Sequence, residues 1–204
     1  MPYRPTERTR ARLAAARERI VEAALLQLAE GGYASASVVA VARRAGVATG
    51  SVYRHFPSKG DLFAEVFRRA ALREVDVLIS MTDRRERVTH RLAAWVEAFV
   101  RRALAEPVRA YALIAEPVDP AVEAERLTFR RAYADLFERA LHDGIRAGEL
   151  PAQDAQLAAT AIVGALAEAM VGPLQRRDTG ADALVAGLQA FVLQSVGAHV
   201  HAVS

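Results

Sequence analysis

Apolar residues recur every three to four positions along most of this 204-residue chain, and this spacing is the feature that most limits its fold. In the first such run, the apolar positions are Leu13, Ala16, Ile20, Ala24 and Leu28. The spacing matches one face of an α-helix, and Gly31-Gly32 ends the run because glycine readily leaves helical geometry. Since no segment alternates convincingly as a β-strand does, the sequence predicts an all-α protein.

The pattern predicts about nine helices in two units. Their expected ranges are 13–29, 37–45, 49–55, 58–81, 88–103, a short helix opened by Pro107, 129–140 extended to Gly144 or Gly148, 154–175 and 181–199. Residues 1–56 are expected to form a small N-terminal helix-turn-helix unit, in which 1–9 are a disordered basic arm. Residues 57–204 are expected to form a larger helical bundle.

Charge is divided unevenly between these two units. Residues 1–60 hold nine of the 26 arginines and the only lysine, Lys59, against four glutamates. The rest of the chain holds seventeen arginines against twenty acidic residues, so the net charge of +3 comes from the N-terminal part. This asymmetry indicates a polyanionic partner for that end, although a solvated basic tail gives the same count.

Composition narrows the possible sites and the cellular location. There is no cysteine, which excludes disulfides, thiolate metal sites and thiol catalysis and fits a reducing cytosol. The uncharged stretch from Ala155 to Ala167 is shorter than the roughly 20 residues of a membrane span, and no apolar segment of a signal peptide follows the N-terminus. We therefore expect a soluble cytoplasmic protein with no membrane partner.

The stretch from Ser37 to Phe56 has the organisation of two short helices and a tight turn. Ser37 is expected to cap the first helix through its side chain, and Gly46 to supply the left-handed backbone of the turn. In the second helix Val52 and Phe56, four residues apart, face inward. Such a short helix needs neighbours to hold it and leaves one face free, as in a helix-turn-helix that enters the DNA major groove.

The free face carries residues suited to DNA. Arg54 can donate twice to a guanine edge, while Tyr53 and His55 can reach phosphates. Ser58 to Asp61 has the spacing of a capping box, so a new helix starts there with Lys59 beside its N-terminus, and we expect this ammonium group to grip the DNA backbone. Arg4, Arg8, Arg10 and Arg12 form either a minor-groove arm or a disordered tail, and the sequence leaves both open.

The segment "GGYASASVVAVARRAGVATGSVYRHFPSKGDLF" resembles the DNA-binding region of the tetracycline-repressor (TetR) family of bacterial transcriptional regulators. The resemblance covers roughly residues 12–67. Ala36 and Ala48 depart from the hydroxyl residues common at these places, and Ser37 and Thr49 are possible substitutes. The DNA-contacting residues that the resemblance and the free face imply are Ser37, Ala48, Thr49, Gly50, Ser51, Tyr53, Arg54, His55 and Lys59. Among these, Thr49, Ser51 and Arg54 lie at positions that vary in the family and are expected to choose the operator.

The resemblance also implies a homodimer and a small-molecule effector, with the bundle as the ligand-binding and dimerisation domain. Small residues in 157–172 let another helix approach closely, and 181–199 has a second apolar side. The resemblance implies that these two helices pair with their copies in a four-helix dimer interface, while the residues alone also fit two central helices of the bundle. The expected interface residues are Ala161, Ala165, Ala169, Leu184, Leu188, Phe191 and Val192. Aromatic and other residues expected around an effector are Trp95, Phe99, Tyr111, Phe129, Tyr133, Glu168 and Met170. Aromatics at this helical spacing more often belong to an ordinary core. Glu168 is compatible either with orienting a cationic ligand or with pairing with an arginine across the interface.

The sequence therefore predicts a homodimeric, ligand-responsive transcriptional regulator. The favoured form is a repressor that a small molecule releases from a near-palindromic operator. A helical enzyme is the first alternative, but no histidine follows a glutamate by three residues and no phosphate-binding loop or nucleophile elbow is present. We therefore expect no catalysis and no cofactor. His199 and His201 lack an acidic or thiol partner, so no metal site is expected. A DNA-compacting protein without an effector is the second alternative.

Overall fold

The computed structural model describes residues 6–82, 86–176 and 180–198, and these form helices with no strand among them. The helices are α1 Glu7–Ser35, α2 Val38–Ala45, α3 Thr49–His55, α4 Lys59–Ser80, α5 Val88–Ala105, α6 Pro107–Ile114, α7 Pro120–Arg146, α8 Ala155–Arg176 and α9 Ala181–Ser195. The all-α prediction and its N-terminal helix-turn-helix are confirmed.

Local sequence signals set most helix ends. Gly32 has a φ of 74° and breaks α1 three residues before its end, and Gly46 has a φ of 65° and ends α2. The Ser58 side chain accepts a hydrogen bond from the Asp61 N–H at the start of α4, as the capping-box spacing predicts. Pro107 and Pro120 open α6 and α7, where a missing N–H does no harm.

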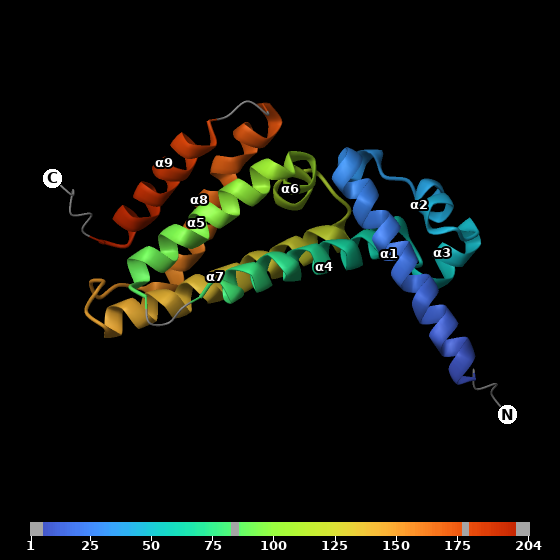
Figure 1. Ribbon diagram of the computed structural model, residues 1–204, viewed down its shortest axis with the longest axis horizontal. Coiled ribbons are helices and arrows are strands. Elements are labelled where there is room, and N and C mark those ends of the chain that lie inside the picture. Colours follow the sequence, from blue (N-terminus) through green and yellow to red (C-terminus); the bar gives the residue numbers. More distant parts are fainter. Residues whose placement is uncertain (1–5, 83–85, 177–179, 199–204) are drawn as a thin grey trace.

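Helix α1 begins much earlier than expected. Thr6 caps it by accepting a hydrogen bond from the Thr9 N–H at 3.3 Å, so residues 7–9 are helical and not part of an arm. The start of α1 extends past α3 and away from the rest of the chain (Figure 1). Pro2, Arg4 and Pro5 lie outside the described residues.

The molecule has two hydrophobic cores. The first joins α1, α2 and α3 to the first half of α4, with contributions from the end of α6 and the start of α7; its fully buried side chains include Ile20, Leu28, Phe63 and Val122. The second holds the remainder of the bundle around Trp95, Phe137 and Met170. The core around the helix-turn-helix therefore extends beyond residue 56, because the short helices α2 and α3 need α4 beneath them.

Long helices connect the two cores. α4 starts beside α3 and runs into the bundle next to α7 (Figure 1). α6 packs on α1 at one side and on α8 at the other, and α9 covers α5. Any change in the bundle that moves α4, α6 or α7 is thus transmitted directly to the unit that carries α3.

Candidate nucleic-acid interface and ligand cavity

The recognition helix α3 exposes one face and buries the other. Val52 is 1% exposed and Phe56 3%, whereas Tyr53 is 49% exposed. Ala48, Gly50, Tyr53 and Arg54 are exposed, and Thr49, Ser51 and His55 are half-buried. This is the division that the spacing of Val52 and Phe56 predicts.

Arg54 is oriented by its own helix. Its Nη2 donates a hydrogen bond to the Ser51 hydroxyl at 2.8 Å, one turn earlier on the same exposed face. The remaining guanidinium donors are available for a base edge. Gly50 has no atom within 4 Å of where a Cβ would stand, so this part of the face is open enough for close approach.

Ser37 does not act as the sequence predicts. It occupies the N-cap position of α2, but its side chain makes no cap hydrogen bond. Its backbone N–H donates to Gln27 Oε1 at 3.2 Å instead, and the residue is exposed. Ala48, the N-cap of α3, has no side-chain acceptor, so the starts of both short helices keep uncapped N–H groups.

Lys59 is half-buried and has partners inside the protein. Its Nζ donates to the backbone carbonyl of Tyr33 at 3.0 Å and lies 4.2 Å from the centre of the Tyr33 ring. The sequence predicts an ammonium group directed at DNA, whereas the structure ties it to the end of α1. Because an ammonium has three hydrogens, this bond leaves two of them for a phosphate.

The loop between α6 and α7 holds the break in α1. The Glu116 carboxylate accepts hydrogen bonds from the backbone N–H groups of Tyr33 at 2.7 Å and Ala34 at 2.9 Å. The Tyr33 hydroxyl donates to Asp119, and burial followed by this hydrogen bond raises the pKa of Tyr33. The carboxylates of Glu116 and Asp119 thus both accept hydrogen bonds from Tyr33, the residue whose carbonyl binds Lys59.

Arg126 of α7 fixes that loop from the other side. It is 7% exposed, and its guanidinium donates to the carbonyls of Ala112, Leu113 and Glu116 and to the Glu123 carboxylate. Burial lowers the pKa of Arg126, but four hydrogen bonds compensate its charge. Carbonyls at the end of α6, which have no helical partner, are thereby satisfied.

A narrow cavity of about 40 Å³ opens next to Arg126 in the second core. Its lining is apolar apart from two arginines and consists of Leu78, Trp95, Phe99, Leu113, Ile114, Arg126, Phe129, Arg130, Tyr133, Phe137, Val163, Leu166 and Ala167. Arg130 is exposed at its edge and donates to the Ile114 carbonyl at 3.2 Å.

A second hollow of about 40 Å³ shares Phe99, Phe129 and Tyr133 with this cavity and ends in charged groups. There Glu74 of α4 receives two hydrogen bonds from Arg102 of α5, at 2.8 and 2.9 Å, and one from Arg109 of α6 at 3.4 Å. Burial, and then the nearby Glu74 carboxylate, raises the pKa of Tyr133, which keeps its hydroxyl neutral.

Four of the seven residues predicted around an effector line the first cavity: Trp95, Phe99, Phe129 and Tyr133. Met170 is fully buried in the core, Glu168 lies on the exposed face of α8, and Tyr111 accepts a hydrogen bond from Gln175 outside both hollows. The sequence prediction missed Arg126 and Arg130. Their spacing of four residues places both on one face of the same helix, and this was the available signal that they act at one site.

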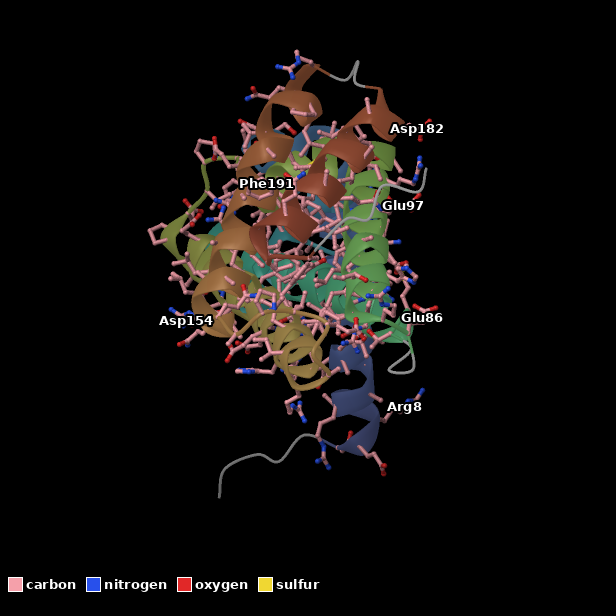
Figure 2. The ribbon with its side chains drawn as sticks, turned by 90° about the vertical axis from the view of Figure 1, so that its left-hand side faces the viewer. Arg8, Glu86, Glu97, Asp154, Asp182 and Phe191 are labelled. Atoms are coloured by element: carbon pink, nitrogen blue, oxygen red, sulfur yellow. The ribbon has the colours of Figure 1, made fainter. Side chains whose placement is uncertain are left out.

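The predicted interface residues divide between surface and core. Ala161 and Phe191 are exposed, and Ala165, Ala169 and Leu184 are half-buried. Leu188 and Val192 are 9% and 0% exposed within the chain's own core, so their side chains are not available to a partner. Figure 2 shows α9 in front of the bundle with Phe191 labelled on it.

The described residues bear on two further expectations, the absence of a metal site and the absence of a membrane span. No group of three or more histidine or acidic residues among them is arranged to hold a metal ion, and His199 and His201 lie outside that part of the chain. One described helix, α8, is long and apolar enough to cross a membrane by length and composition alone. The uncharged stretch from Ala155 to Ala167 is too short for a membrane span, whereas the whole helix is longer because it continues beyond Glu168. In this fold α8 packs against α7 and α6.

The arrangement of α1 to α3 matches a known family of regulators. Residues 20–66 match the model described as "Bacterial regulatory proteins, tetR family", and residues 85–170 match "Tetracyclin repressor-like, C-terminal domain". The chain belongs to the TetR family. TetR-family proteins are transcriptional regulators that bind DNA, dimerise and bind small molecules, and they are not enzymes.

Curated relatives match only part of the chain. The HTH-type transcriptional repressor KstR of Mycolicibacterium smegmatis is 41% identical over 68 residues, which are 33% of this chain and 31% of that protein. KstR of Rhodococcus jostii is 45% identical over 53 residues, 26% of this chain and 25% of the relative. The matched segment thus spans a third or less of these relatives.

Solved TetR-family folds match nearly the whole chain. The fatty acid degradation regulator FadR from Bacillus halodurans has a TM-score of 0.75 at 26% identity, covering 87% of this chain and 94% of that one. FadR from Bacillus subtilis in complex with stearoyl-CoA has a TM-score of 0.76 at 20% identity, covering 88% and 98%. At the latter identity the likeness concerns the fold alone.

Proposed function

We propose that this protein is a homodimeric repressor that binds a near-palindromic operator and is released from it by a small apolar effector. The observation that carries the proposal is the open face of α3, where Arg54, Tyr53 and Gly50 are exposed on a helix held from behind by Val52 and Phe56. Bacterial DNA lies in the cytoplasm, and the protein acts there in this proposal.

We assign recognition of the operator base pairs to Thr49, Ser51 and Arg54. We assign phosphate binding to Tyr53, His55, Lys59 and the uncapped N–H groups at the starts of α2 and α3, next to Ser37 and Ala48. Two copies of α3 reach the successive major grooves of a near-palindrome when they stand about 34–36 Å, or a multiple of this, apart. Dimerisation is therefore part of the DNA-binding function.

Footprinting of genomic fragments with the purified protein tests this directly. A repressor protects one short symmetric site, while a DNA-compacting protein spreads along the duplex. Arg54→Ala is expected to relax discrimination at one or two base pairs, costing roughly 1–3 kcal/mol. Arg131→Ala, an exposed arginine on α7, is the matched control and leaves binding unchanged. Unchanged binding and discrimination in Arg54→Ala refute the assignment of α3.

Lys59→Ala separates two roles for the lysine. If Lys59 binds a phosphate, the variant lowers affinity about equally for all sequences and reduces the slope of log affinity against log salt by about one. If the ammonium acts only on the Tyr33 carbonyl, the variant unfolds at a lower denaturant concentration while the salt slope stays the same. Measuring both quantities on one preparation decides between them.

The effector is proposed to have a largely apolar body and an anionic group. The cavity supports this, because its lining is aromatic and aliphatic and its two charged residues are the arginines Arg126 and Arg130. The stearoyl-CoA in the B. subtilis FadR structure makes a long-chain acyl thioester a reasonable first probe. An effector releases DNA only if it favours the conformation whose recognition helices are misplaced.

Thermal shift and operator release with stearoyl-CoA, stearate and stearylamine test this ligand class. The two anions are expected to stabilise the protein and release DNA, while the amine does neither. Val163→Phe fills the cavity and abolishes the response but keeps operator binding. A response to the amine alone, or an equal response in Val163→Phe, contradicts the proposed site.

A further inference from the structure

The first three turns of α1, residues 7–19, lie outside both hydrophobic cores. Residues 6–19 are exposed or half-buried, and the first fully buried residue of the helix is Ile20. This part of α1 extends beyond α3 in Figure 1, and Figure 2 shows the same end, with Arg8 labelled, protruding from the rest of the chain. A helix of this length and without packing is marginal in water.

Local sequence keeps these turns helical. The segment is made largely of alanine, arginine, leucine and glutamate, which favour helix, and Thr6 caps its start. Near the base, Arg17 fastens α1 to α4 through Glu65 at 3.2 Å and lies 4.9 Å from the centre of the Phe56 ring, at the end of α3. The projecting turns are therefore held rigidly beside the recognition helix.

The projecting turns carry an unbalanced positive charge. Within the described residues, Arg8, Arg10, Arg12 and Arg19 make no ion pair or side-chain hydrogen bond. Of the two acidic residues there, Glu18 is bound to Arg69 of α4, and Glu7 lies in the first turn. At 3.6 residues per turn, Arg8, Arg12 and Arg19 share one side of the helix, and Arg10 lies on the side of Arg17.

We propose that this part of α1 lies along the DNA just outside the half-site read by α3 and binds backbone phosphates through Arg8, Arg12 and Arg19, which share one side of the helix. The inference depends on the proposed DNA-binding function. Charge complementarity selects the duplex as the occupant, since arginine is the side chain best matched to phosphate oxygens. Continuity selects the place, because Arg17 ties the same helix to the end of α3.

The geometry sets the size of the added contact. Thirteen residues of helix span about 20 Å, the length of roughly six base pairs of duplex. Phosphate contacts position a protein without reading sequence, so the segment is expected to raise affinity and lengthen the footprint without changing the preferred operator.

The test compares wild type with the triple variant Arg8→Gln, Arg12→Gln and Arg19→Gln, because glutamine keeps helix propensity and removes the charge. On an operator with long flanks the variant is expected to lower the salt slope by about two to three and to bind roughly tenfold or more weakly at low salt. On a duplex trimmed to the two half-sites, wild type and variant are expected to bind equally. Hydroxyl-radical protection is expected to shorten at both ends in the variant.

A matched control replaces Arg131 and Arg139, exposed arginines on α7, with glutamine. Circular dichroism checks that the triple variant keeps its helix content. If the variant keeps the salt slope and footprint length of wild type while Arg54→Ala still relaxes sequence discrimination, the contact by α1 is refuted and the proposed function stands. If wild type protects no specific site at all, the proposed function itself fails.

Discussion

Glu65 joins the projecting helix α1 to α4. It is 10% exposed and accepts hydrogen bonds from Arg17 of α1 and from Arg68 and Arg69 of α4. Burial by itself raises the pKa of Glu65, but the hydrogen bonds from Arg68, Arg17 and Arg69 outweigh it and lower the pKa to about 2. A carboxylate held by three guanidinium groups stabilises the folded state as long as it is ionised.

Glu65→Gln is expected to lower the free energy of unfolding at pH 7 by about 2 kcal/mol. The folded-state pKa lies below the ordinary value of 4.5, so this stabilisation is complete above pH 4.5 and disappears as the pH falls toward 2. Urea denaturation at pH 7, 4 and 3 measures the difference. Glu22→Gln, which changes an exposed glutamate on α1, is the control and stays within about 0.5 kcal/mol of wild type. A penalty independent of pH contradicts the ionic origin.

Gly32→Ala is expected to destabilise the protein by about 1–2 kcal/mol. Gly32 has a φ of 74°, and an added Cβ stands 2.8 Å from Glu116 Oε2, so the methyl group both strains the backbone and displaces the carboxylate. Gly50→Ala, where an added Cβ meets no atom within 4 Å, is the control and keeps or slightly raises stability. Equal midpoints in thermal and urea denaturation for all three proteins count against the strain.

At the scale of elements, the loop between α6 and α7 is the closest link between the cavity and the DNA-binding unit. Arg126 lines the cavity and holds the carbonyls of α6 and of Glu116. Glu116 and Asp119 in turn hold Tyr33 at the end of α1, where Lys59 of α4 also binds. A ligand that moves Arg126 therefore acts through hydrogen bonds on two helices of the DNA-binding unit, α1 and α4.

Glu116→Gln is expected to lose one of the two hydrogen bonds to the Tyr33 and Ala34 N–H groups, because the amide nitrogen cannot accept. The expected cost is about 1–2 kcal/mol of stability. Hydrogen exchange at these two amides is expected to accelerate, while amides in α9 keep their rates. Asp135→Asn, an exposed residue of α7, is the control. Unaltered exchange at both amides shows that the loop does not hold α1.

At the scale of the whole molecule, α8 and α9 present a surface of small and apolar side chains that the chain itself leaves uncovered. Its exposed residues are Leu157, Ala161, Gly164, Ala183, Gly187, Ala190 and Phe191. Leu157 is 67% exposed and Phe191 47%. Small residues allow helices to approach closely, so a second copy of α8 and α9 suits this surface, in agreement with the dimers of the family.

Phe191→Glu and Ala161→Glu are each expected to weaken dimerisation roughly a hundredfold, because an unpaired carboxylate would be buried between the copies. Sedimentation equilibrium measures this, and operator affinity is expected to fall with it. Leu127→Glu changes an apolar residue that is 46% exposed on α7 and leaves the dimer intact. Variants that remain dimeric place the interface on another surface.

The sequence alone determined the local features of the fold. The bounds of α3, the left-handed Gly46, the break at Gly32, the Ser58 cap and the inward side of Val52 were predictable. Each depends on residues within about four positions of one another, where backbone hydrogen bonding and side-chain period act directly. The same local rules identified the exposed face on which the proposed DNA contact depends.

Only the tertiary structure decided which distant groups meet. It directed Lys59 to the Tyr33 carbonyl, enclosed Leu188 and Val192 in the core and brought Glu116 to the backbone of a residue 83 positions earlier. It also assembled the cavity from α4, α5, α6, α7 and α8, so that Arg126 and Arg130 became its charged residues. A helical period states which side of a helix is buried, but the partner on that side is set by how the helices pack in space.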